Sequence, residues 1–276
     1  MTRAPALDER PLGARHSSRT RVYLAAATIA ARHAWANPVE IIGRGVFLGL
    51  LLVVFSGLWR AVPLGEGAPD ARGLLWYLAI TEWVILSLPL VHLDLERDVR
   101  TGDLAYLLPR PVSYVGVRVA EHLGTLAVRM ATLAPVAAVL ATLLAGGLPG
   151  DPRGLLLAVP LGVMAGVLGV ITYASIGLTA VWLQDVTPVY FVWQKSAFVL
   201  GGLILPLHLY PAWLAAIARW TPFAALLHGP GRTAFGFDPA GAATTAGLLA
   251  SWTALFAYAL HRIHRAALRI LDVNGG

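Results

Sequence analysis

Long apolar stretches separated by short polar segments make up most of the chain. Six of these stretches approach the roughly 20 apolar residues that a helix needs to cross a bilayer. They cover residues 39–62, 73–93, 114–145, 154–183, 189–205 and 240–260. This pattern predicts an all-α integral membrane protein with six transmembrane helices.

The N-terminal segment 18–35 differs, because it mixes arginines with Val22, Ile29 and other apolar residues at helical spacing. It is too polar to span, so we expect an amphipathic helix along the inner membrane surface, ended at Asn37-Pro38. The first twenty residues contain no apolar run typical of a signal peptide, so we expect no cleavage. The expected division is a cytoplasmic tail with this interfacial helix at 1–38, a transmembrane domain at 39–262 and a basic cytoplasmic tail at 263–276.

The positions of the arginines predict the orientation. With the N-terminus inside, the inner segments hold the arginines between residues 3 and 44, between 97 and 118 and between 262 and 269. The outer connections hold only Arg60, Arg72, Arg153, Arg219 and Arg232. Because cytoplasmic loops carry an excess of basic residues, we expect both termini in the cytoplasm, as an even number of crossings requires.

A short helix is predicted in the cytoplasmic connection between the second and third spans. Asp103 follows Gly102 and can cap a helix that Pro109 stops. The apolar residues of this helix project on one side: Leu104, Leu107 and Leu108. The connection also carries charged residues that can pair around this apolar cluster: Glu96, Arg97, Asp98 and Arg100.

The outer connection 206–239 is unusually apolar for a loop. Pro211 and Pro222 each precede a short helical sequence, and proline suits a first helical turn. Trp213, Trp220 and Phe223 are residues that favour the membrane interface. We therefore expect a re-entrant helical hairpin that dips into the outer surface and returns.

Composition supports the membrane assignment and excludes several classes of protein. The 276 residues are 57% hydrophobic and 13% charged, against about 45–50% and about 25% in soluble domains. Cysteine is absent, which excludes disulfide frameworks and thiolate chemistry. The net charge of +6 fits basic loops at the inner leaflet, and no nucleic-acid partner is expected.

No catalytic or metal site is recognisable in the sequence. A phosphate-binding loop needs a Gly-Lys-Ser/Thr ending, but the only lysine, Lys195, follows Gln194. His261 and His264 stand one helical turn apart beside arginines, which favours a solvated basic tail over a metal site. We expect no cofactor on this chain, and any ATP hydrolysis on a partner.

Four ionisable residues fall inside or near the predicted spans: Glu82, Glu121, Arg129 and Lys195. Such groups are costly in lipid and normally face the protein interior. They could form a polar translocation path or structural ion pairs, and we favour the ion pairs. Glu82 and Arg129 lie roughly 18 and 22 Å from the inner ends of their helices at about 1.5 Å per residue, so we predict that they meet.

Three local sequences carry a resemblance to a known family. LERDVRTGDLAYLLPRPVSY at 95–114, GGLILPLHLYPAWLAAIARWTPF at 201–223 and the C-terminal ALRILDVNGG resemble segments of permease subunits of type-2 ATP-binding-cassette exporters. The similarity extends over nearly the whole chain from Val22. The C-terminal sequence resembles a bacterial subfamily in which two unlike permeases share one type of ATPase.

The resemblance implies a function, partners and a location. The helix at 103–108 would seat in a nucleotide-binding ATPase subunit that holds ATP and magnesium, and a second, unlike permease would complete the path. The expected location is the bacterial cytoplasmic membrane, in contact with lipid. The alternative is a non-transporting membrane assembly or anchoring subunit. An intramembrane hydrolase or a secondary transporter is disfavoured, because paired acidic motifs and matching broken helices are absent.

Overall fold

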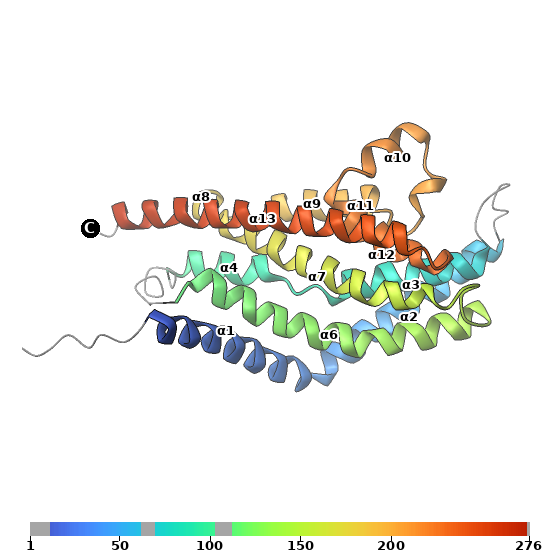
Figure 1. The fold of residues 1–276 in the computed structure, drawn as a ribbon, viewed down its shortest axis with the longest axis horizontal. Helices are drawn as coiled ribbons and strands as arrows, with labels where there is room; N and C mark the ends of the chain where they lie inside the picture. The colour runs from blue at the N-terminus through green and yellow to red at the C-terminus, as the bar shows by residue number, and fades with distance from the viewer. Residues whose placement is uncertain (1–11, 62–69, 103–111, 275–276) are drawn as a thin grey trace, which may run out of the picture.

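The computed structural model describes residues 12–61, 70–102 and 112–274 of the chain. These residues form helices joined by short connections, with no strand among them, so the predicted all-α class is confirmed. Five helical segments in the described ranges are long and apolar enough to cross a membrane: Pro38–Ala61, Ala71–Arg100, Tyr114–Ala145, Gly154–Leu183 and Pro239–Arg269. Figure 1 shows them side by side in one elongated bundle.

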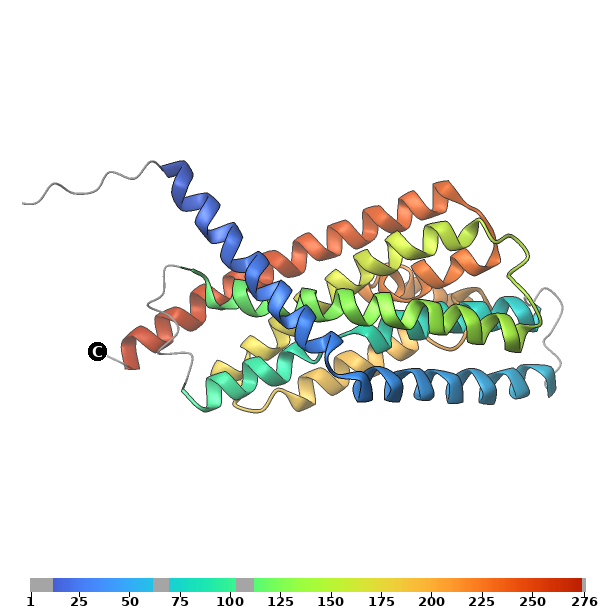
Figure 2. The same cartoon turned by 90° about the horizontal axis from the view of Figure 1, so that it is seen from below.

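The first helix, α1 (Leu12–Trp35), packs across α6 (Tyr114–Ala145), as both views show (Figures 1 and 2). The helices touch at Gly124, where an added Cβ would lie 2.0 Å from the carbonyl oxygen of Ala27. Glycine is required there because any side chain would push α1 away. The predicted helix is therefore present, and it packs against the bundle. It ends at Trp35, just before Asn37-Pro38, where the sequence predicted its end.

The helix α2 (Pro38–Ala61) begins at a proline, as the first turn of a helix permits. The predicted second span is broken into α3 (Ala71–Ser87) and α4 (Val91–Arg100). Pro89 lies in the break, and it cannot donate a helical hydrogen bond. The helix α3 forms the centre of the core, since its residues from Gly73 to Val84 are all buried between α2, α6 and α7.

The predicted fourth span is α7 (Gly154–Leu178) followed by the single turn α8 (Ala180–Leu183). Glycines let α7 approach its neighbours: a Cβ on Gly162 would lie 2.3 Å from the ring of Trp83. A Cβ on Gly177 would lie 2.7 Å from the Cα of His92 in α4. The α7 helix thereby joins both halves of the broken span to the core.

The prediction of a fifth span over residues 189–205 is wrong for residues 201–205, which lie beyond the helix. The helix α9 (Thr187–Leu200) has 14 residues, or about 21 Å at 1.5 Å per residue, which is short of the roughly 30 Å hydrocarbon core. It ends at Gly201, and Gly202 adopts φ +66°, a conformation that favours glycine. Six full-length spans are therefore not confirmed.

The connection 206–239 folds into several short helices at the far end of α9 (Figure 1). They are η1 (Leu207–Leu209), α10 (Ala212–Ala218), α11 (Pro222–Leu226), α12 (His228–Gly231) and η2 (Arg232–Phe235). The predicted helix starts are confirmed, because Pro211 directly precedes α10 and Pro222 is the first residue of α11. The chain then turns back, so α13 (Pro239–Asn274) starts at the same end of the bundle.

The last helix extends beyond the predicted boundary at residue 260, to Asn274. No proline or glycine interrupts the sequence between Gly247 and the end of this helix. Buried Leu260 and Ala267 continue the inward face, while the arginines point outward. The basic segment is therefore helical, and its end lies at the same end of the bundle as the start of α1 (Figure 1).

Candidate functional site: the charged network around the α4–α6 connection

The helices on either side of residues 103–111 are joined by a buried polar contact. Asp98, near the end of α4, is 3% exposed. It accepts a hydrogen bond from the hydroxyl of Tyr114, the first residue of α6. The guanidinium of Arg118 forms an ion pair with the same carboxylate at 2.5 Å. We call Asp98, Tyr114 and Arg118 the α4–α6 clamp.

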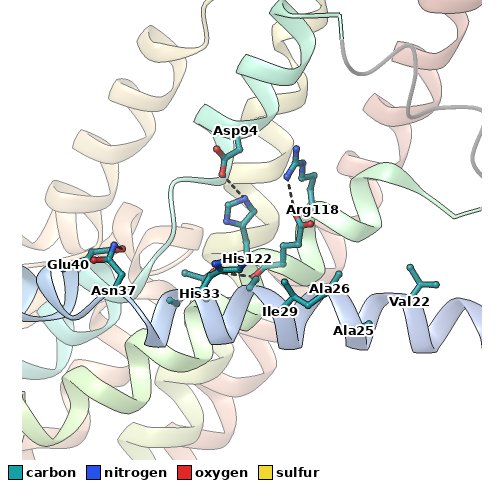
Figure 3. A pocket seen from close by; sticks show the side chains of 14 residues that line it. Val22, Ala25, Ala26, Ile29, His33, Asn37, Glu40, Asp94, Arg118 and His122 are labelled. Atoms are coloured by element: carbon teal, nitrogen blue, oxygen red, sulfur yellow. Dashed lines mark hydrogen bonds and ion pairs between the residues drawn. The ribbon is translucent and has the colours of Figure 1, made fainter.

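Further polar contacts, ion pairs among them, extend the clamp along both helices. The Nε2 atom of His122 lies 3.2 Å from Asp94 of α4, and Arg118 also donates to Glu121 at 3.0 Å (Figure 3). Arg97 pairs with Asp94 at 3.0 Å, and Arg100 pairs with Glu96 at 3.2 Å. Opposite charges three or four residues apart reach one another on a helix, as the sequence led us to expect. The carboxylate of Glu96 is nevertheless buried, so these pairs are part of the packed structure.

A groove of about 770 Å³ lies between α1 and this network (Figure 3). One wall is the apolar face of α1, with Val22, Ala26 and Ile29. The other wall carries Asp94 and His122, which point toward each other from α4 and α6 (Figure 3). Residues of α4 and α6 from the charged network thus face a space between α1 and the bundle.

The predicted contact between Glu82 and Arg129 is wrong. Arg129 instead forms an ion pair with Glu40, in the first turn of α2, and donates to the carbonyl oxygen of Leu88 at 3.1 Å. Arg44 pairs with Glu40 at 3.0 Å and donates to the Leu86 carbonyl. These carbonyls lie at the C-terminal end of α3, where a helix leaves acceptors unpaired and its dipole attracts cations.

The direction of the Arg129 side chain explains the error, since the two helices do meet at the predicted level. The indole Nε1 of Trp83, next to Glu82, donates to the carbonyl oxygen of Met130, next to Arg129, at 3.0 Å. The Arg129 guanidinium instead reaches the carbonyl oxygen of Leu88, where the helix breaks before Pro89. Glu82 is 5% exposed in the middle of α3, and no ion pair to it occurs within the described ranges. Glu121 does form an ion pair, as we favoured for the four ionisable residues of the spans. Its partner is Arg118, on the same helix.

Lys195 does not face the interior. It lies on the exposed side of α9, with its ammonium group over the rings of Phe191 and Phe198 at 5.0 and 5.4 Å from their centres. The neighbouring Val192 is 65% exposed. This face of α9 therefore presents apolar side chains and one cation outside the fold of the single chain.

The apolar knob of the predicted cytoplasmic helix cannot be compared with the structure. Asp103, Leu104, Leu107 and Leu108 lie outside the described residues. What the structure provides are the two helices that enter and leave that segment, and the clamp that joins them.

The outer hairpin places its aromatic residues in two ways. Trp213 and Trp220 on and after α10 are 66% and 76% exposed. Phe223 instead packs against Trp193 of α9, with ring centres 4.5 Å apart. The turn after α9 is held by α3, because Tyr77 donates to the Gly202 carbonyl and Thr81 donates to that of Leu203 at 2.8 Å.

Sequence reasoning missed an aromatic cluster near the clamp. The ring of His92 stacks on Tyr190 of α9 at 3.8 Å and meets the edge of Tyr173 of α7 at 5.5 Å. It joins α4 to two helices that follow much later in the chain. Single aromatic residues in apolar stretches gave no signal for it, because long-range contacts leave no spacing pattern.

No three His, Asp or Glu side chains of the described ranges gather as a metal site would require. No model of a known protein family matches the chain, and no curated protein matches it. The functional argument therefore rests on the residues and their geometry.

Proposed function

We propose that this chain is a membrane-spanning subunit of an ATP-driven exporter, forming half of its translocation path. A separate nucleotide-binding subunit would contact the segment 103–108 on the cytoplasmic side. The observation that carries the proposal is the α4–α6 clamp, which ties together the helices on both sides of this segment.

A segment that transmits a push must be anchored firmly to the parts that it moves. The clamp meets this requirement, since a buried carboxylate holds a hydroxyl and a guanidinium of the next helix within ten residues of either end of the segment. Stiff helices α4 and α6 continue from it into the bundle. A push on the segment would therefore reach the core as a movement of two helices together.

The orientation follows from the basic residues. The described start of α1 and the end of α13 lie at one end of the bundle, together with the clamp (Figure 1). Arginine is enriched at this end, which favours the cytoplasmic face of a bacterial inner membrane. The short hairpin helices would then lie at the outer face, over the exit of the path.

The exposed face of α9 supports a second permease as partner. A lysine facing lipid near the middle of a bilayer costs about 2.5–3.5 kcal/mol on insertion scales. A partner that offers an acceptor to Lys195 and apolar contacts to Val192 would remove this cost. We therefore propose that α9 lies in the interface between two permeases, unlike ones in the subfamily that the sequence resembles.

The experiment is purification of the chain from its native membrane with its bound partners. An exporter subunit should bring down an ATPase and a second permease, and a drug-like or lipid amphiphile should change the rate of ATP hydrolysis in reconstituted vesicles. Recovery of a complex without ATPase would contradict the proposal and favour an assembly or anchoring subunit. An Asp98→Asn variant should retain the partners but lose the response to the amphiphile, whereas Asp151→Asn, at the opposite end, should retain both.

A further inference from the structure

A pocket of about 540 Å³ lies between the hairpin and the first turns of α13, at the opposite end from the clamp. Two arginines, two histidines and two threonines form its polar lining: Arg219, Arg232, His208, His228, Thr244 and Thr245. No carboxylate lines this pocket in the part of the chain that the structure describes. Apolar residues such as Leu207 and Leu248 form the remaining wall.

The two guanidinium groups differ in what holds them. Arg232 forms an ion pair with Asp238 at 2.5 Å, and Asp238 lies in an adjoining hollow. Arg219 has no hydrogen bond or ion pair to any described side chain, and it is exposed. The pocket therefore offers one free cation and one cation that is only partly neutralised.

His228 adds a polar group to the lining of this pocket. Burial, with smaller contributions from the nearby Arg232, His208 and Arg219, lowers its pKa to about 4. The ring is therefore neutral at neutral pH. Tyr77 donates its hydroxyl proton to the Gly202 carbonyl, so Nδ1 of His228, 3.2 Å from the Tyr77 oxygen, carries the hydrogen of that contact. The Nε2 atom of His228 then carries a lone pair, which can accept a hydrogen bond from a hydroxyl group of a ligand.

The surroundings of the pocket fit a membrane ligand. Trp220 lines the pocket and is 76% exposed, and Ile217, in the helix α10 just before it, is 56% exposed. Figure 1 shows α10 standing out from the bundle beside α13. Exposed tryptophan and isoleucine at the end of a membrane bundle favour the boundary between headgroups and hydrocarbon.

We propose that this pocket binds the anionic headgroup of an amphiphile, with Arg219 and Arg232 contacting a phosphate or carboxylate. The hydrocarbon chain would lie along the apolar wall toward Trp220. Charge-assisted hydrogen bonds from guanidinium groups to phosphate are strong and directional, which suits this ligand. This site does not depend on the proposed coupling to an ATPase.

The test is native mass spectrometry of the purified chain in a nonionic detergent. Phosphatidylglycerol and phosphatidylcholine with the same acyl chains are added separately, and inorganic phosphate is added as the free-anion probe. We expect phosphatidylglycerol to bind more tightly than both other probes. Arg219→Gln should weaken its binding about tenfold, which corresponds to loss of one charge-assisted contact. Arg72→Gln, at an exposed arginine that lines neither hollow, should leave it unchanged.

A second variant separates ligand binding from effects on folding. Asp238→Asn removes the carboxylate that neutralises Arg232 but keeps an oxygen for the amide of Gly241. It should tighten binding of phosphatidylglycerol, opposite in sign to Arg219→Gln. Equal binding of phosphatidylcholine, equal binding of inorganic phosphate, or equal effects of Arg219→Gln and Arg72→Gln would each overturn the proposal.

Discussion

Replacing Asp98 by alanine should destabilise the bundle strongly, because it removes the shared acceptor of the α4–α6 clamp. Breaking a buried ion pair from one side costs about 3–5 kcal/mol. The side chain of Arg118 is 25% exposed and keeps Glu121 at 3.0 Å, so solvent and this second partner offset part of the loss. We therefore expect about 2–3 kcal/mol for Asp98→Ala.

The assay is reversible unfolding in mixed micelles, followed by circular dichroism, for the parent, Asp98→Ala, Arg118→Ala and the double variant. The double variant should be more stable than the sum of the single changes predicts, by at least about 1 kcal/mol. The matched control is the cycle of Asp151 and Arg153, an ion pair of 2.9 Å in the exposed connection at the other end. That cycle should show no measurable coupling. Additive effects in the clamp cycle, or equal losses for Asp98→Ala and Asp151→Ala, would refute the reasoning.

Glu40→Leu should lower the stability more than Arg129→Leu does, because it leaves both Arg44 and Arg129 without a carboxylate, whereas Arg129→Leu leaves the Glu40–Arg44 pair intact. Combining Arg129→Leu with Glu82→Leu should give additive losses in the same unfolding assay. Cysteine at Val192, in a chain without native cysteine, should form crosslinks to the second permease in intact membranes; failure to crosslink under conditions that crosslink a control pair would contradict the α9 interface. The pKa of His228 falls to about 4 on folding. Its contribution to the free energy of unfolding is therefore complete above pH 6.5, and up to about 3 kcal/mol of it is lost as the pH falls toward 4. His228→Gln should therefore flatten the stability profile between pH 6.5 and 4, and an unchanged profile would count against this cause.

The sequence predicted the elements that depend on local pattern. The bounds of α6 match the apolar stretch 114–145, and the prolines before α10 and α11 begin helices as expected. These features follow from composition and from the missing N–H of proline, which act within a few residues.

The errors arose where distant residues decide the structure. The break at Pro89 was hidden inside an apolar stretch, and it leaves the carbonyl oxygen of Leu88 to accept from Arg129, which was expected to contact Glu82. Glu40 lies within the predicted first span 39–62 and was given no partner, although α6 brings Arg129 to it across the bundle. Asp98 of the clamp was singled out among the charged residues at 96–100, but Tyr114 and Arg118 gave no local signal as its partners.

The central claim is that the segment 103–108 couples an ATPase to the spans, and an uncoupling experiment tests it most directly. Leu104→Asp combined with Leu107→Asp would replace the predicted apolar knob by charge. In vesicles that hold the complete complex, the account predicts normal insertion and ATP hydrolysis, with transport abolished. Leu148→Asp, in an exposed connection at the opposite end, should leave transport unchanged. Full transport by the double variant would contradict the account.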